Sequence, residues 1–235
     1  MSTGWAVAPL AAYDSETTSA DPHTAHLVTA CVVTINDGDP TPRTWLANPG
    51  IDIPAEATAV HGITTEHARA HGADPAAVAD QVLTALLEAW AAGQPIVGYN
   101  IAFDLTVLDA ELRRHGVCDG LPMVGPVIDP LVLDRGLDRY RRGKRTLGAA
   151  CEHYGVRLDG AHDATADALA AARVAWRIAQ RHPDVAALDL DALTALQTRM
   201  HLAWAENFQA HLASKGSTEI IDTAWPLRAA VPATA

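Results

Sequence analysis

Two carboxylates stand one residue apart in the segment LAAYDSETT at residues 10–18. Asp14 and Glu16 follow a short apolar run, and side chains two positions apart on a β-strand point to the same face. Adjacent negative charges oppose each other unless a positive group lies between them. Exposed strands also carry such pairs by chance. The pair therefore raises the question of whether a cation belongs there.

Two further acidic residues lie near the starts of expected helices. Asp104 follows Asn100 by four residues in GYNIAFD, and Asp167 follows His162 by five residues in HDATAD. Taken singly, each feature has a structural interpretation, since an Asp on a helix is usually exposed and a His beside a helix start is usually not catalytic. Together they form the ordered patterns D-x-E, N-x-x-x-D and H-x-x-x-x-D.

These patterns resemble the DEDDh 3′–5′ exonucleases, the DnaQ-like family that includes the proofreading subunits of DNA polymerase III. YDSETT, GYNIAFD and HDATAD match its three motifs, and AVHGIT at 59–64 and TLGAACEHYGV at 146–156 resemble its intervening segments. The resemblance covers roughly residues 8–180. A sister group carries Tyr four residues before the last Asp; that position is Asp163 here, so His162 indicates the His subclass. Tyr99 departs from the His that the family often has before Asn100.

The resemblance implies a site for two Mg²⁺ or Mn²⁺ ions, which prefer oxygen ligands. Asp14 would bridge both ions, Glu16 and Asp167 would hold the ion that binds the attacking water, and Asp104 would support the other. His162 would be the general base, because an imidazole takes up a proton near neutral pH. The implied product is a nucleoside 5′-monophosphate released from a 3′ end.

The resemblance also suggests which residues receive the terminal nucleotide. Backbone amides and side chains at the end of the first strand would contact it, and an apolar wall would enclose the base and sugar. The candidates are Thr17, Thr18, His61, Ile63, Asn100 and Phe103. Phe103 is equally suited to the core. A basic segment, DRYRRGKR at 138–145, is either a solvated surface or a contact for the substrate backbone.

Composition is consistent with a folded protein that binds nucleic acid locally. The 235 residues are 49% hydrophobic and carry a net charge of −11, which does not suit coating a long nucleic acid by charge alone. Three scattered cysteines, no basic leader and no long apolar run predict a soluble cytoplasmic protein that does not bind membranes.

Hydrophobic patterns predict a mixed α/β fold. The expected strands are 6–13, 26–35, 42–47, 96–98 and one within 124–130. The expected helices are 74–90, 100–114, 130–138, 146–154 and 163–181. With the resemblance, this order implies a ribonuclease H-like fold, in which helices flank a mixed five-stranded sheet.

The chain divides by character into an exonuclease domain, residues 1–183, and a C-terminal helix and tail, residues 184–235. An apolar stripe from Leu193 to Leu212 either packs on the first domain or pairs with another chain, such as a second copy or a polymerase. The favoured function is trimming of single-stranded DNA 3′ ends. The alternatives are 3′–5′ degradation of RNA or short oligonucleotides, and a non-catalytic protein stabilised by metal.

Overall fold

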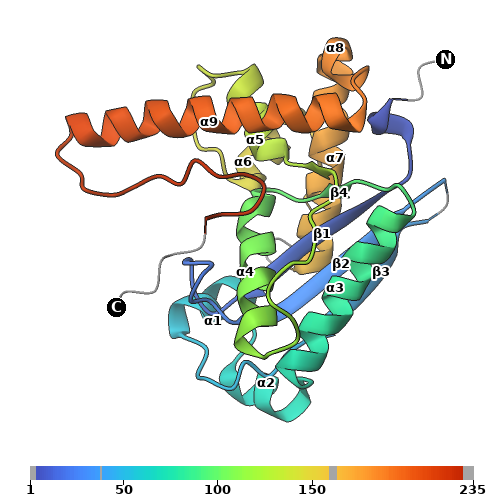
Figure 1. The fold of residues 1–235 in the computed structure, drawn as a ribbon, viewed down its shortest axis with the longest axis vertical. Coiled ribbons are helices and arrows are strands. Elements are labelled where there is room, and N and C mark those ends of the chain that lie inside the picture. The colour runs from blue at the N-terminus through green and yellow to red at the C-terminus, as the bar shows by residue number, and fades with distance from the viewer. Residues whose placement is uncertain (1–3, 38, 159–162, 230–235) are drawn as a thin grey trace.

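The computed structural model describes residues 4–37, 39–158 and 163–229. These residues form a five-stranded sheet in the order β3-β2-β1-β4-β5 (Figure 1). The central strand β1 is antiparallel to β2 and parallel to β4, so the sheet is mixed, as in a ribonuclease H-like fold. The strands are β1 (Leu10–Thr17), β2 (Leu27–Ile35), β3 (Thr41–Leu46), β4 (Ile96–Val97) and β5 (Val127–Ile128).

The first strand begins later than the sequence pattern indicates. The expected range was 6–13, but β1 spans Leu10–Thr17 and a short 3-10 helix, η1 (Trp5–Val7), precedes it. Pro9 has no N–H for a sheet hydrogen bond, which explains why the strand starts directly after it. As a result Asp14 and Glu16 lie within the strand and not beyond its end.

Helices cover both faces of the sheet. In Figure 1, α3 and α4 lie in front of the sheet and α7 lies behind it. The short helices α1 and α2, on either side of Gly62, were not predicted from the sequence. The helices are α1 (Ala55–His61), α2 (Thr65–His71), α3 (Pro75–Ala91), α4 (Ile101–Arg114), α5 (Pro130–Leu137), α6 (Leu147–Tyr154), α7 (Ala164–Arg181), α8 (Pro183–Ala186) and α9 (Leu190–Ser214).

The alternation of side chains along β1 creates two cores. Ala11 and Tyr13 belong to the core under α3 and α4, whereas Ala12 belongs to the core under α7. Because both faces are covered, the strand is apolar at consecutive positions before the acidic residues begin. Residues that follow on one face of β1 therefore lie near the start of α4, and residues on the other face lie near the start of α7.

The C-terminal segment packs partly against the preceding residues, in agreement with the intramolecular alternative. Leu193 on α9 is buried in the core under α7, and Trp225 of the tail is buried in the core under α4. The far half of α9 projects from the body, and the tail runs back along it (Figure 1). Gln209 on α9 pairs with the tail through the Glu219 carbonyl and the Ile221 N–H.

Among the described residues, no helix combines the length and the apolar character that crossing a membrane requires.

Candidate active site

The alternation of β1 distributes the acidic residues of the first motif. Asp14 and Glu16 share the face of Ala12, toward α7, while Ser15 shares the face of Tyr13, toward α4. Asp167 lies in the first turn of α7, which packs directly on this strand. The strand therefore brings its two carboxylates to the start of α7, although Asp167 is distant in sequence.

Three carboxylates meet on this face. One oxygen from each of Asp14, Glu16 and Asp167 lies within 4.8 Å of the others. All three side chains keep some access to solvent. The first and third motifs therefore lie side by side in the fold.

The fourth carboxylate approaches through a neighbour. Asp104 is 4% exposed in the first turn of α4, and the Ser15 hydroxyl donates to its Oδ1 at 2.6 Å. Asp104 nevertheless influences the electrostatics of both Asp14 and Glu16. The structure thus places one carboxylate on the α4 side of the site and three on the α7 side. Ser15, which the sequence reasoning overlooked, connects the two sides.

The clustered charges perturb one another strongly. Burial first, then Asp104 and Asp167, raise the pKa of Asp14 well above its ordinary value. Burial and Asp167 raise the pKa of Glu16 to about 7. Burial also raises the pKa of Asp104 to about 7, although its hydrogen bond with Ser15 acts in the opposite direction. The folded chain thus concentrates negative charge that cations would stabilise.

The donor set fits hard divalent cations. All ligand atoms of the cluster are carboxylate oxygens, which suit Mg²⁺ and Mn²⁺ better than softer metals. These oxygens lie close enough to share a cation, and a bound cation would offset the repulsion between the carboxylates. The residues present therefore fit the predicted metal ions.

The predicted general base, His162, lies outside the described residues. Its neighbour Asp163 is the N-cap of α7, where its carboxylate accepts hydrogen bonds from the N–H groups of Thr165 and Ala166. This cap sets the start of the helix that carries Asp167. Assignment to the His subclass therefore rests on the sequence.

Asn100 is the N-cap residue of α4, but its side chain makes no capping hydrogen bond. Its backbone adopts a left-handed conformation, with φ of 64°, and its N–H donates to Oδ1 of the buried Asp129 at 3.0 Å. Asp129 follows β5 and also accepts from the N–H of Leu131. Sequence reasoning overlooked Asp129, although its place in an Asp-Pro pair after a buried strand was a signal. It positions the turn from which Asp104 is presented.

The residues proposed to contact the nucleotide differ in their surroundings. Thr17 lies at the end of β1 and its hydroxyl donates to the Ser19 carbonyl. Thr18 is buried and its N–H already donates to the His26 carbonyl at 3.0 Å, so this amide is not free to bind substrate. Phe103 is partly buried against the core, which agrees with its alternative interpretation. All three remain predictions as substrate contacts.

His61 and Ile63 lie at the junction of α1 and α2. The N–H of Ile63 donates to Nδ1 of His61, which fixes the orientation of this imidazole. Ile63 also packs against a small core cluster that includes Val28 and Ile53. These two residues likewise remain predicted substrate contacts.

Two arginines of the basic segment form ion pairs within the fold. Asp134 on α5 is fully buried and binds the guanidinium groups of Arg141 and Arg145. The Tyr99 hydroxyl donates to the carbonyl of Arg145, so this departure from the family motif helps to hold the segment. The remaining basic residues of the segment are exposed: Arg139, Arg142 and Lys144.

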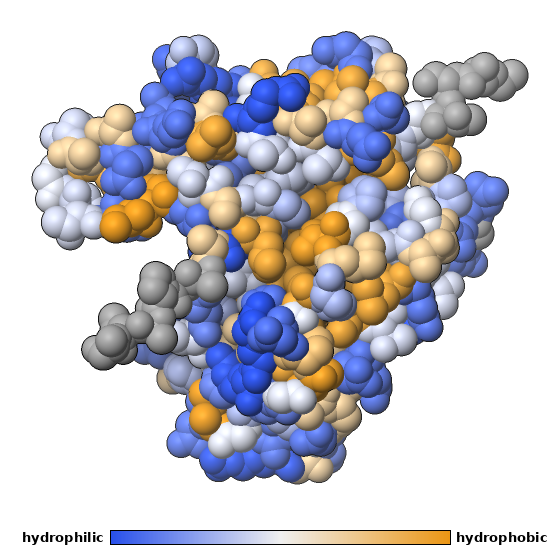
Figure 2. Space-filling view, in the orientation of Figure 1, coloured by the Kyte–Doolittle hydropathy of each residue, from blue (hydrophilic) through white to orange (hydrophobic). Residues whose placement is uncertain are grey.

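Residues of α5, α9 and the tail line a groove of about 1510 Å³. Its lining includes Asn100, Arg135, Trp204 and Phe208. The Arg135 guanidinium lies 3.7 Å from the ring centre of Trp204, which stacks on Phe208. Figure 2 shows α9 and the tail standing out from the body beside this region. The groove reaches the start of α4 but is not lined by the four carboxylates.

The carboxylates and this sheet define a nuclease-like site. A family model described as exonuclease (RNase_T) matches residues 11–175, a stretch that contains all four carboxylates. The chain therefore belongs to the DEDD exonuclease family, in its DnaQ-like group. The family predicted from the sequence is thereby confirmed.

Similar proteins include two bacterial polymerases of the DNA polymerase III PolC type. The Lacticaseibacillus paracasei protein is 37% identical over 83 residues, which cover 35% of this chain and 6% of the relative. The Streptococcus sanguinis protein is 33% identical over 141 residues, which cover 57% of this chain and 9% of the relative. This chain therefore corresponds to a small part of these polymerases.

Solved structures of exonuclease I share the fold. The Escherichia coli enzyme in complex with a dT13 oligonucleotide has a TM-score of 0.60 and 20% identity, over 76% of this chain and 42% of that one. Exonuclease I from Methylocaldum szegediense has a TM-score of 0.59 and 25% identity, over 75% of this chain and 41% of that one. The chain thus spans less than half the length of each exonuclease I. The shared part has the ribonuclease H-like fold.

Proposed function

We propose that the protein is a metal-dependent 3′–5′ exonuclease that releases nucleoside 5′-monophosphates from single-stranded DNA. The observation that carries this proposal is the meeting of Asp14, Glu16 and Asp167 in a chain of the DEDD exonuclease family. A protein fold does not determine an activity, so the argument depends on the site.

The chain's own residues would hold two divalent ions, Mg²⁺ or Mn²⁺. Asp14, Glu16 and Asp167 provide oxygens on the α7 side, and Asp104 provides one on the α4 side. The ions would supply an activated water and stabilise the charge that develops on the leaving 3′ oxygen. Ser15 keeps the Asp104 carboxylate in one orientation, which favours a constant site geometry.

We assign proton transfer from the attacking water to His162. This assignment rests on the sequence, in which His162 stands five residues before Asp167. General bases contribute about 100- to 10,000-fold to a rate. A His162→Gln variant should therefore lose activity by that order while its binding of Mn²⁺, measured by calorimetry, stays unchanged. Equal activity in the variant would remove His162 from the mechanism.

Single-stranded DNA is favoured over RNA because of two independent observations. The exonuclease I structures that share this fold were solved with DNA oligonucleotides such as dT13, and the similar sequences belong to DNA polymerases. The aromatic and arginine side chains of the groove would offer a stacking surface to a single strand of either DNA or RNA. RNA remains the alternative substrate, because the metal chemistry is common to both.

The deciding experiment compares single-stranded DNA and RNA of equal sequence, each labelled at the 5′ end. With Mg²⁺ or Mn²⁺ the DNA should shorten from its 3′ end, and chromatography should identify nucleoside 5′-monophosphates. EDTA and the Asp14→Asn variant should abolish the shortening, whereas Asp80→Asn, an exposed change on α3, should not.

The other outcomes separate the alternatives. Faster shortening of RNA would make the protein an exoribonuclease. Folded protein that gains stability from metal but shortens neither polymer would be a non-catalytic, metal-stabilised member of the family. A polymerase partner or self-association through residues 184–235 would appear as a larger mass in light scattering.

A further inference from the structure

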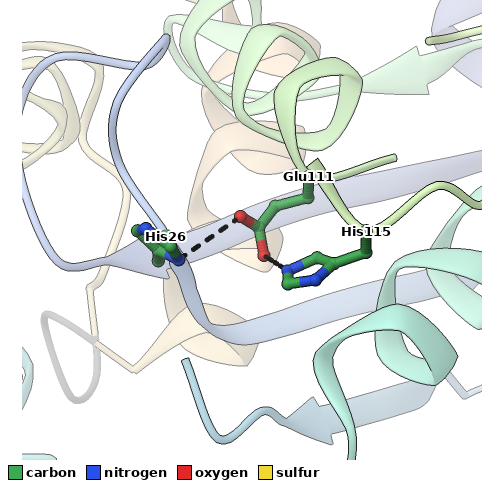
Figure 3. A group of neighbouring side chains, drawn as sticks. All are labelled: His26, Glu111 and His115. Carbon is green, nitrogen blue, oxygen red and sulfur yellow. Dashed lines mark ion pairs between the residues drawn. The ribbon is translucent and has the colours of Figure 1, made fainter. Parts of the chain in front are cut away.

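A second group of metal-ligand side chains lies away from the four carboxylates. His26 directly precedes β2, Glu111 lies in the last turn of α4, and His115 is the residue that follows this helix. One ligand atom from each lies within 4.8 Å of the others. Figure 3 shows the Glu111 carboxylate between the two imidazole rings. Glu111 and His115 are four residues apart, which places them on one side of the helix end.

The ligand atoms of this group have no hydrogen bonds among the described residues. Glu111 is fully buried, and its Oε2 makes no hydrogen bond. Nδ1 of His26 and Nε2 of His115 are likewise buried atoms without a hydrogen-bond partner. Buried polar atoms without partners cost free energy, so three that face one another require an explanation.

The distances fit a shared ion better than direct hydrogen bonds. Nε2 of His115 lies 3.4 Å from Oε2 of Glu111, and Nδ1 of His26 lies 3.9 Å from Oε1. Ligand bonds of 2.0–2.1 Å to a tetrahedral zinc ion place neighbouring ligand atoms about 3.3 Å apart. A small rotation of the side chains would therefore bring all three ligand atoms to bonding distance, and water would supply the fourth ligand.

The neighbouring Arg114 holds the carboxylate without closing the site. It donates to Oε1 of Glu111, and its other hydrogen bonds go to the carbonyls of Ala25 and His23. Oε2 is thus left for a different partner. The arginine also fixes the loop before β2 against α4.

The surroundings of both imidazoles favour the neutral form, which is the form that binds metals. Burial and Arg114 lower the pKa of His26, and the same two causes lower the pKa of His115. Neutral imidazoles offer a nitrogen lone pair. A hydrogen bond with the Pro49 backbone acts in the opposite direction on the pKa of His26. Such a bond to the other ring nitrogen leaves Nδ1 as the acceptor, as is usual for metal-binding histidines.

We propose that His26, Glu111 and His115 form a zinc site that fastens the β1–β2 connection to the end of α4. Two nitrogens and one carboxylate oxygen suit Zn²⁺, whereas the oxygens of Asp14, Glu16 and Asp167 suit harder ions. His26 is joined to Thr18 by two hydrogen bonds, from the Thr18 N–H and to the Thr18 hydroxyl. The zinc ion would therefore hold the end of β1 close to α4, which carries Asp104.

The test measures zinc binding and needs no nuclease activity. Protein freed of metal would carry Asp14→Asn, so that the carboxylate site is weakened, and a chromophoric chelator would compete for Zn²⁺. We expect one equivalent to bind. His26→Gln or His115→Gln should weaken binding at least tenfold, and His71→Gln, an exposed change on α2, should leave it unchanged. Unchanged affinity in both cluster variants would overturn the proposal.

A second measurement leaves the cluster intact and so does not depend on how its variants fold. X-ray absorption at the zinc edge of the Asp14→Asn protein should show scattering from two imidazole rings. A shell of oxygen ligands without imidazole, or no bound zinc, would overturn the proposal. Because neither readout uses DNA, the zinc site and the exonuclease activity stand or fall separately.

Discussion

Ser15 determines how the two sides of the acidic site are joined. It lies between Asp14 and Glu16 in sequence, but it points to the opposite face of β1 and donates to Asp104. Its partner is 89 residues away. A residue that orients a metal ligand contributes through that ligand and touches no substrate itself.

Replacing Ser15 by Ala should lower exonuclease activity by about 10- to 100-fold, the usual cost of removing a partner of a metal ligand. The loss should shrink as the Mg²⁺ concentration rises, because the variant binds the ion more weakly. A titration of rate against Mg²⁺ measures this. Ser19→Ala, an exposed change in the next loop, is the control. A loss that does not depend on Mg²⁺ would contradict the positioning role.

At the scale of elements, α5 holds the basic segment through one buried carboxylate. Asp134 binds Arg141 and Arg145, and the Tyr154 hydroxyl donates to it at 2.9 Å. Burial acts to raise the pKa of Asp134, but the hydrogen bonds from Arg141, Arg145 and Tyr154 outweigh it and lower the pKa below 3.8. Since the folded state favours the charged form, this stabilisation is complete above the unfolded pKa and is lost as the pH falls through the folded one.

Asp134→Asn should therefore reduce the free energy of unfolding by about 3–5 kcal/mol at pH 7, because two arginines lose their buried partner. The difference from the wild type should narrow as the pH is lowered below the unfolded pKa of 3.8. Urea unfolding at a series of pH values measures it. Asp80→Asn serves as the exposed control. A difference that stays constant down to low pH would refute the ionised role of Asp134.

Helix α9 is attached to the sheet by a polar contact. Gln197 is fully buried; its Oε1 accepts from the Asp129 N–H at 2.7 Å, and its Nε2 donates to the Val127 carbonyl at 2.9 Å. The amide thus extends the hydrogen bonding of β5 and supports the Asp129 turn. Two residues of the apolar stripe flank this contact: Leu193 is buried in the core under α7, and Met200 packs against both cores.

Gln197→Leu keeps a similar volume but leaves the backbone groups of Asp129 and Val127 without partners. We expect a loss of about 1–3 kcal/mol in the free energy of unfolding, together with faster proteolysis of the C-terminal segment. Thermal unfolding and timed trypsin digestion measure the two effects. Gln180→Leu, on the exposed end of α7, should change neither. An unaltered digestion rate in the Gln197 variant would show that this contact does not hold α9.

At the scale of the whole molecule, the proposed function requires an acidic protein to bind an acidic polymer. The net charge of −11 opposes nucleic acid at a distance, so attraction has to come from local sites. Arg139, an exposed base of the basic segment, lines the groove together with Asn100 and Arg135. We predict that these bases supply the local positive surface, which is one of the two interpretations that the sequence left open for the segment.

Changing Arg139, Arg142 and Lys144 together to Gln should weaken binding of single-stranded DNA. If all three contact phosphates, the slope of log affinity against log salt should fall by about 2, at roughly 0.7 per contact. Fluorescence anisotropy in EDTA measures binding without cleavage. A control variant changes three exposed arginines on β3, α2 and α7: Arg43, Arg69 and Arg173. Equal slopes in the two variants would show that the basic segment is a solvated surface that does not contact the DNA.

Local patterns in the sequence were sufficient to identify the family and the mixed sheet, and to select the four carboxylates as candidates for the site. Each motif consists of residues that lie close together in the sequence, so it can be recognised without a structure. The order of strands and helices follows from hydrophobic periodicity and from the positions of Gly and Pro. Short elements were less predictable: β1 starts after Pro9, and the two seven-residue helices α1 and α2 were overlooked. Such short elements contain too few turns for a clear period.

The tertiary structure alone decided which side chains meet across the fold. Ser15 with Asp104, Gln197 with Asp129, and His26 with Glu111 and His115 each join segments far apart in the chain. No spacing rule predicts such pairs, because they depend on which faces of strands and helices are buried against one another. The sequence by itself thus determined the acidic chemistry of this protein, and the packing of its helices on the sheet determined how that chemistry is held in place.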